Sequence, residues 1–361
     1  MNYKIPFINK KATDLSRISE LLELCAKENM FANRGPLYKM LTENYSAHFG
    51  LDSSRSIVPC ANAGIALEAM ARLLSMRNGK NLKWAGSAFS FQNLGRGHFS
   101  DMTFVDCTSQ GLLDLNAIRE LPENTFDGIV VVNPFGLNGN FDAYIKFSLE
   151  TGKFLLIDNA AGVGAKLPDW PWQALSLHHT KPYGMGEGGL ALTPSDVAEE
   201  FYSLLNYGAI PDDPKAWVNN GKISDISCAF LIERLEKVSE WEPLYLEQAE
   251  RVHGVCISND LKPLLPFPST SPAMSWPYLS PNAVLPEQIT RSEKITFAKY
   301  YKPVADFSQA NYLYSHLLNV PTHPDLAILS DTELTHEISQ VIEFATLDRN
   351  GKNTAEVRAQ F

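Results

Sequence analysis

The chain has 361 residues, of which 45% are hydrophobic and 20% are charged, and its formal net charge is −10. A chain of this length and composition is expected to form two globular domains with a sizeable core. The acidic balance argues against a nucleic-acid partner, because binding a polyanion requires a concentrated basic face.

The N-terminal residues, MNYKIPFINKK, lack the apolar core of a signal peptide. No run along the chain approaches the ~20 apolar residues that a membrane span needs. The five cysteines are scattered and never paired as CxxC, which favours free thiols in a reducing compartment over disulfides or a zinc site. We therefore expect a cytoplasmic protein without a membrane partner or a bound metal.

Helices are expected first along the chain, followed by alternating strands and helices. Residues 13–30 place apolar side chains at helical spacing, and a Gly-Pro pair at 35–36 separates them from a second helix at 38–49. The later apolar runs of strand length are 56–59, 81–85, 102–105, 128–132 and 154–157, and a helix is expected at 63–76. Such alternation predicts an α/β sheet covered by helices on both faces.

The C-terminal third has a different pattern. Residues 223–252 are expected to form one long amphipathic helix that connects two domains. Residues 258–288 are rich in proline and serine, which is typical of irregular crossings and short strands. We interpret them as the start of a second domain.

The segment 175–189, LSLHHTKPYGMGEGG, places Lys181 beside several glycines. Glycine lets the backbone come close to a bound group. A lysine in a partly dehydrated place loses its preference for the ammonium form, so that its free amine can attack a carbonyl carbon. On this segment alone, a glycine-rich surface turn with a solvated lysine is an equally good interpretation.

The segment 154–165, FLLIDNAAGVGA, is an apolar strand that ends in Asp158. An acid at the carboxyl end of a strand in an open α/β sheet is placed for ligand binding. A carboxylate there could keep the pyridine nitrogen of pyridoxal phosphate (PLP) protonated, and the protonated ring accepts electrons. Taken alone, Asp158 is more simply interpreted as a helix N-cap.

The segment 60–67, CANAGIAL, opens a helix after a short strand. Free backbone N–H groups at a helix start, together with the helix dipole, can bind a phosphate. Taken alone, an ordinary capped helix explains this segment equally simply.

In their order and spacing the three segments resemble the DegT/DnrJ/EryC1/StrS family of sugar aminotransferases, a branch of the fold-type I PLP enzymes. The family pattern SFHxTK…GEGG is matched at 176–181 and 187–189, EDAAQxxGA at 157–165 without gaps, and NGTxAL at 62–67. Weaker similarities extend the resemblance over nearly the whole chain, at residues 33–36, 133–136, 220–226, 301–303 and 318–326.

The resemblance implies a fold and an activity. A large domain, residues 1–245, would contain a mixed, mostly parallel seven-stranded sheet, and residues 246–361 would form a small C-terminal α/β domain. The enzyme would move an amino group from L-glutamate to a keto group of a nucleotide-linked deoxysugar. It would work as a homodimer with shared active sites.

The resemblance also implies roles for individual residues in binding PLP. Lys181 would hold the cofactor as a Schiff base and shuttle a proton during catalysis, and Asp158 would pair with the pyridine nitrogen. The backbone N–H groups of Ala63 and Gly64, with the Ser176 hydroxyl, would hold the phosphate.

Two further assignments depend on the resemblance. Asn220 would reach the phosphate bound by the neighbouring subunit, which is why a dimer is expected. Phe89 would stack on the cofactor ring, with Phe91 or simple core packing as the alternatives.

The sequence departs from the family pattern in three places. Ala161 stands where the family usually has Gln, and Gly64 replaces Thr in the phosphate-binding segment. The connection from Pro303 to Leu318 is shorter than the loop with which relatives help cover a nucleotide-linked sugar.

Three rival functions follow from these observations. One is amination of a sugar or sugar acid that carries no nucleotide, which the short connection favours. Another is dehydration of a sugar at C3, but that branch of the family replaces the Schiff-base lysine with His, whereas Lys181 is present here. The third is a non-catalytic regulatory protein, against which the presence of both Lys181 and Asp158 argues.

Overall fold

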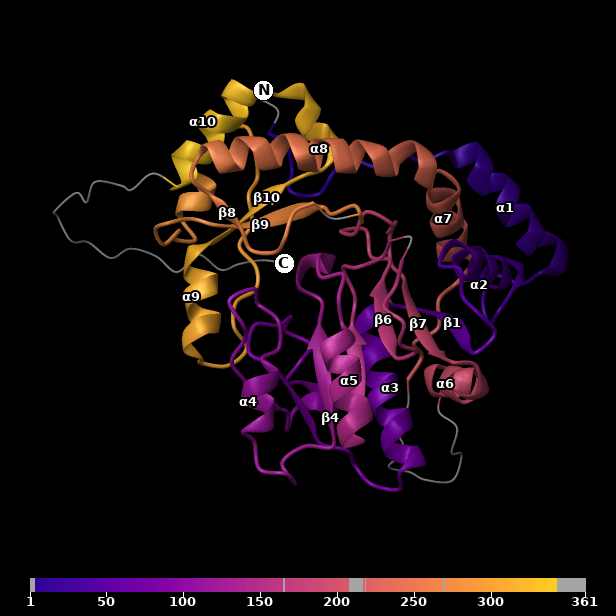
Figure 1. The fold of residues 1–361 in the computed structure, drawn as a ribbon. Coiled ribbons are helices and arrows are strands. Elements are labelled where there is room, and N and C mark those ends of the chain that lie inside the picture. Colours follow the sequence, from indigo (N-terminus) through magenta and orange to yellow (C-terminus); the bar gives the residue numbers. More distant parts are fainter. Residues whose placement is uncertain (1–3, 165, 208–216, 218, 269, 343–361) are drawn as a thin grey trace.

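The computed structural model describes residues 4–164, 166–207, 217, 219–268 and 270–342. It contains a seven-stranded sheet of order β1-β7-β6-β5-β4-β2-β3 (Figure 1). The strands are β1 (Arg55–Cys60), β2 (Trp84–Ser87), β3 (Thr103–Val105), β4 (Gly128–Val132), β5 (Phe154–Asp158), β6 (Gln173–Ser176) and β7 (Gly189–Pro194). Only β7 runs antiparallel to its neighbours. The predicted mixed, mostly parallel sheet is confirmed.

Helices cover both faces of this sheet. Ile129 and Val131 of β4 pack on one face with α4 and α5, whereas Val130 packs on the other face with α3. Both faces are therefore apolar, as expected for a largely parallel sheet. The helices of this part are α1 (Leu15–Glu28), α2 (Pro36–His48), α3 (Ala63–Arg77), α4 (Leu115–Arg119), α5 (Asp142–Thr151), α6 (Ala198–Leu205) and α7 (Asp225–Glu236).

The C-terminal part has its own antiparallel sheet of order β10-β9-β8 and a separate apolar core. Its elements are α8 (Val238–Ser258), β8 (Lys262–Pro263), β9 (Ser275–Leu279), α9 (Ser308–His316), β10 (Leu317–Pro321) and α10 (Asp331–Ile342). Helix α8 carries the chain from α7 beside the large sheet to this second sheet (Figure 1). The domain boundary expected after residue 245 stays a prediction, and this residue lies within α8.

Short 3-10 helices complete the described structure: η1 (Gly97–Phe99), η2 (Pro134–Gly136), η3 (Ser195–Val197), η4 (Gln288–Thr290) and η5 (Pro324–Ile328). The N-terminal segment belongs with the C-terminal core, because Ile5 pairs with Ile295 and both are fully buried there. No helix in the described part of the chain has the length and apolar character needed to cross a membrane.

Two predicted elements differ from the structure. The single helix expected at 223–252 is wrong, because the chain breaks at Lys237 between α7 and α8. The Arg234 carbonyl accepts from the indole N–H of Trp241 at 2.8 Å, whereas in a continuous helix this carbonyl would accept from a backbone N–H. The strand expected at 81–85 begins later, at Trp84, because the Leu82 N–H is bound by the Ser75 hydroxyl of α3.

Candidate active site

Segments far apart in the sequence meet at the carboxyl edge of the parallel strands. Asp158 ends β5 and Ser176 ends β6. Ser176 lies opposite Gly189, the first residue of β7, and Gly189 also pairs with Cys60 at the end of β1. Helix α3 begins shortly after Cys60, so its N-terminus lies at the same edge. The structure therefore brings together the three segments that the sequence singled out.

The N-terminus of α3 forms a cradle with β7. Asn62 caps the helix with its side chain, and the amides of Ala63 and Gly64 in the first turn have no acceptor within the helix. A Cβ atom on Gly189 would lie 2.5 Å from the Asn62 carbonyl carbon and 2.7 Å from the Ala63 nitrogen. Only glycine allows this approach. The cradle thus offers free N–H donors beside Ser176, a suitable arrangement for an anion.

Lys181 follows β6 in a tight turn, in which its N–H donates to the His178 carbonyl at 2.9 Å. Among the described residues, its amine has no hydrogen-bond or ion-pair partner. Burial lowers the pKa of Lys181, and the nearby Asp158 carboxylate opposes this shift. A lowered pKa increases the fraction of free amine, which is the form that attacks a carbonyl carbon.

Asp158 is 5% exposed, and burial raises its pKa. Hydrogen bonds from the Ala160 N–H and the Asn93 side chain, together with Lys181, oppose that rise. The carboxylate is therefore desolvated and only partly compensated. Such a group favours a cationic partner. The sequence did not indicate the contact between Asn93 and Asp158.

An aromatic cluster lies beside Asp158. Phe89 is fully buried with its ring edge-on to Tyr301, at 5.6 Å between centroids, and Tyr301 stacks on Phe135 at 4.8 Å. The Asp158 charge acts on the Tyr301 phenol, whose pKa is raised chiefly by burial. Phe91 is 56% exposed. The sequence did not predict that Tyr301 and Phe135 take part in this cluster, because these two residues lie 166 positions apart in the chain.

Asn220 is exposed and pairs with Asn206 in an isolated bridge. The carbonyl of the next residue, Gly221, accepts from the Ala61 N–H at 2.7 Å. This segment therefore lies beside the start of α3 in its own chain. A role for Asn220 toward a neighbouring subunit stays a prediction.

The departures from the expected pattern are visible in the structure. Ala161 is partly buried, and its carbonyl lies so close to Gly136 that a Cβ there would collide with it. A Cβ on Gly64 would lie 3.3 Å from the Asn62 side chain, so a larger residue there would crowd the cap. Ala165, the last residue of the motif that contains Asp158, lies outside the described residues.

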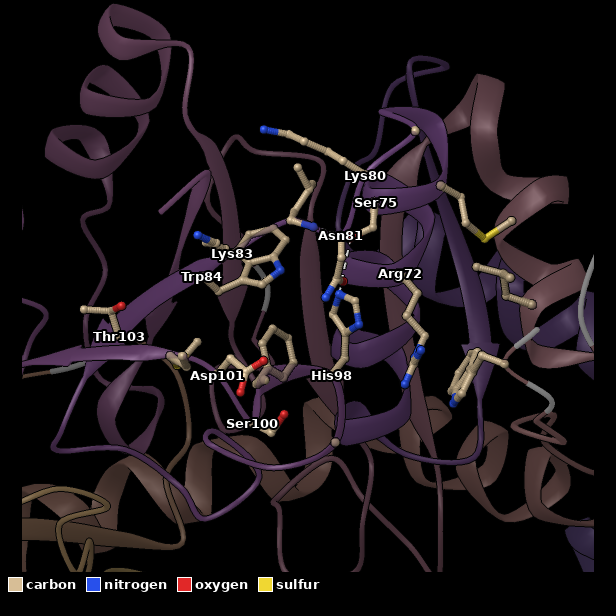
Figure 2. Close-up of a pocket in the computed structure, with 18 of the residues that line it drawn as sticks. Arg72, Ser75, Lys80, Asn81, Lys83, Trp84, His98, Ser100, Asp101 and Thr103 are labelled. Atoms are coloured by element: carbon tan, nitrogen blue, oxygen red, sulfur yellow. Dashed lines mark hydrogen bonds between the residues drawn. The ribbon is translucent and has the colours of Figure 1, made fainter. Parts of the chain in front are cut away.

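A cavity of about 920 Å³ lies at the opposite edge of the sheet (Figure 2). Its lining includes Trp84 at the start of β2, Thr103 at the start of β3, and Arg72, Lys80 and His98. None of the predicted site residues lines it. Ligands of open α/β sheets bind outside the carboxyl ends of the strands, so we assign the active site to the carboxyl edge.

The residues at that edge fit pyridoxal phosphate. The unpartnered Lys181 amine suits an aldehyde, the desolvated Asp158 carboxylate suits a protonated pyridine nitrogen, and the glycine-permitted cradle suits a phosphate. Among the described residues, no group of three or more His, Cys, Asp and Glu side chains could hold a metal ion.

Comparison with known proteins gives three kinds of match. The model of the DegT/DnrJ/EryC1/StrS aminotransferase family matches residues 14–276, which is more than half of the chain. Protein Rv3402c of Mycobacterium tuberculosis is 25% identical over 254 residues, or 64% of this chain. The match spans about three fifths (60%) of the length of that curated relative.

Solved structures of similar fold cover almost the whole chain. PseC of Helicobacter pylori, an aminotransferase involved in the biosynthesis of pseudoaminic acid, has a TM-score of 0.78 at 18% identity, over 95% of this chain and 99% of PseC. A DegT DnrJ EryC1 StrS aminotransferase from Brucella abortus has a TM-score of 0.74 at 18% identity, over 92% of this chain and 98% of that protein. At these identities the likeness shows the fold alone.

Proposed function

Since the chain belongs to the DegT/DnrJ/EryC1/StrS aminotransferase family, we propose that it moves an amino group from L-glutamate to a keto group of a nucleotide-linked deoxysugar. The enzyme class, sugar aminotransferase, and the cofactor, PLP, follow from the family. The observation that carries the proposal is the meeting of Lys181, Asp158 and the cradle at one edge of the sheet.

When bound, pyridoxal phosphate supplies an aldehyde that accepts an amino group and a ring that withdraws electrons from the neighbouring carbon. The side chains of this protein supply binding and proton transfer. The Lys181 amine would move a proton to and from the carbon that bears the donor's amino group, and burial, which lowers the pKa of Lys181, favours the free amine that this transfer needs. The Asp158 carboxylate holds a proton on the pyridine nitrogen.

The cradle orients the cofactor. The N–H groups of Ala63 and Gly64 and the Ser176 hydroxyl donate to the phosphate, which the dipole of α3 also favours. The Phe89 ring, which packs edge-on against Tyr301, would stack on the cofactor ring. Asn220 would donate to the phosphate bound by a neighbouring subunit, and the active unit would then be a homodimer. The location proposed for it is the cytoplasm.

A sugar without a nucleotide is the second candidate, and two observations favour it. Most of the short connection after Pro303 forms helix α9. The first backbone N–H groups of α9 donate to the Asp106 carboxylate, and this segment does not extend over the site. A nucleotide-linked sugar would need Arg34 or another basic residue to hold its diphosphate, but Arg34 is paired with Glu199 at 2.7 Å and lies over the Tyr202 ring. A diphosphate would have to compete with that ion pair.

Turnover of matched keto sugars with and without the nucleotide distinguishes the two substrates. The pyridoxamine-loaded protein is mixed with each sugar, and kcat/KM is measured. Remote binding energy from the nucleotide normally assists the chemical step. The nucleotide-linked substrate is therefore expected to react at least tenfold faster, which corresponds to about 1.4 kcal/mol. A smaller ratio refutes the nucleotide assignment, and no reaction with any keto sugar refutes the sugar aminotransferase itself.

A further inference from the structure

Several backbone carbonyls in the turn that carries Lys181 accept no hydrogen bond from within the turn. Within the turn, the N–H of Lys181 donates to His178 and the N–H of Gly184 donates to the Lys181 carbonyl, both at 2.9 Å. The carbonyls of His179, Pro182 and Gly184 receive no donor from the turn itself. Buried carbonyls need partners, so the turn depends on groups from elsewhere in the chain.

Lys11 binds two of these carbonyls and also the Lys181 carbonyl, which already accepts from the Gly184 N–H. Its Nζ donates to the carbonyls of His179 at 2.6 Å and of Lys181 and Gly184 at 2.5 Å each. An ammonium group has three hydrogens, and all three are used here. Lys11 is 9% exposed, and burial with the nearby Arg234 lowers its pKa, whereas these three acceptors favour the charged form.

Arg234 of α7 holds the same turn at a further point. Its Nε donates to the Pro182 carbonyl at 2.9 Å, and the guanidinium lies over the Trp241 ring at 3.9 Å. Arg234 is 5% exposed. Two buried basic side chains from different segments therefore bind four carbonyls within six residues of the turn.

The segment around Lys11 also contacts the C-terminal part of the chain. Ile5 exchanges backbone hydrogen bonds with Lys294 and Thr296, at 2.8 and 2.9 Å. The N–H of Lys10 donates to the Asp325 carboxylate at 2.8 Å. The residue next to Lys11 is thus fixed to the C-terminal part, while Lys11 itself reaches the turn beneath the active site.

We infer that Lys11 is a positioning residue for Lys181: it binds the carbonyl of Lys181 and two others in the same turn, and so fixes the direction in which the Lys181 amine points. This inference rests on the proposed function, because it gives Lys181 the covalent role. Its basis is the set of hydrogen bonds that Lys11 makes within this chain. The hydrogen bonds of Lys11 are made to the turn and not to the Lys181 amine.

The first test is hydrogen exchange of the apo protein, which requires no activity. In Lys11→Met the amides of Lys181 and Gly184 should exchange about tenfold faster or more, whereas amides of β4 should keep their protection. Lys10→Met is the matched control, because the Lys10 side chain is exposed and makes no contact with the turn. Equal loss of protection throughout the chain, or none in the turn, would overturn the inference.

The second test is the rate at which the apo protein binds PLP covalently at Lys181, followed by absorbance. Misplacing the amine should slow capture by Lys11→Met about tenfold or more, with Lys10→Met at the wild-type rate. Wild-type capture by Lys11→Met would overturn the inference alone, whereas no capture by the wild type would overturn the proposed function. If Lys11→Met fails to fold, Lys11→Arg replaces it in both tests, because a guanidinium cannot place its hydrogens on the same three carbonyls.

Discussion

Asp158 and Asn159 are neighbours in the chain with different partners, so their substitution should have opposite effects on stability and on turnover. Asn159 is 1% exposed; it accepts from the Asn133 side chain at 2.7 Å and donates to Gln173 Oε1 at 3.2 Å. Asp158 is also buried; it accepts from the Ala160 N–H at 3.2 Å and from the Asn93 side chain, and burial raises its pKa. The Asn159 side chain therefore stabilises the fold, whereas the Asp158 carboxylate remains available to a ligand.

The expected magnitudes follow from these contacts. Asn159→Ala leaves two buried polar partners with a lost hydrogen bond, which should lower the free energy of unfolding by about 2–4 kcal/mol. Asp158→Asn preserves the shape and removes a charge whose burial is unfavourable, so the apo protein should lose less than about 1 kcal/mol. An amide cannot hold the pyridinium charge, so kcat/KM should fall about 10²–10³-fold, as for loss of one electrostatic group in an active site.

Two assays test whether the two substitutions have opposite effects on stability and on activity. Urea unfolding of the apo proteins gives the free energies, and initial rates with saturating PLP give kcat/KM. Asn159→Ala should be the less stable variant and the more active one when measured well below its unfolding transition. Equal losses of activity at both positions, or a large loss of stability in Asp158→Asn, would show that Asp158 is a structural cap.

Three further predictions concern the cradle and the amine. Gly189→Ala should weaken PLP binding at least tenfold, or about 1.4 kcal/mol, because its Cβ would lie 2.5 Å from the Asn62 carbonyl carbon; an unchanged Kd by fluorescence titration would contradict the cradle. Ser176→Ala removes one hydrogen bond to a charged group, worth about 1.5–3 kcal/mol, and should raise the Kd for PLP about 10–100-fold. The rate of PLP capture by the apo protein should rise with pH through a midpoint below ~10.4, the ordinary pKa of lysine, because burial lowers the pKa of Lys181. Asp158→Asn should move that midpoint lower still, because the carboxylate opposes the shift, and a move upward would reverse the sign of this interaction.

The sequence predicted the α/β sheet for an identifiable physical reason, whereas the roles of the site residues followed from the family resemblance. Strands β4 and β5 are buried on both faces, so they stand out as continuous apolar runs. Asp158 ends such a strand, and the carboxyl edge of a parallel sheet is where ligand groups collect. These features are local in sequence. The strand that ends in Ser176 begins with Gln173, is not a continuous apolar run, and was not predicted.

The contacts that could not be predicted join distant segments. Lys11 is one of three lysines among the first eleven residues, and nothing local in the sequence indicates that its acceptors are carbonyls about 170 residues away. The break at Lys237 depends on the Trp241 indole, whose donor could have found other acceptors. The position of Phe89 depends on Tyr301, which the sequence analysis assigned no role.

The account depends above all on the identity of the lysine that binds the cofactor. The PLP-loaded protein is reduced with borohydride, digested, and the labelled peptide is sequenced. The pyridoxyl group is expected on Lys181 alone, and Lys181→Ala should bind PLP without retaining it after reduction. A label on any other lysine, or no label on a protein that has bound PLP, would contradict the assignment of the active site.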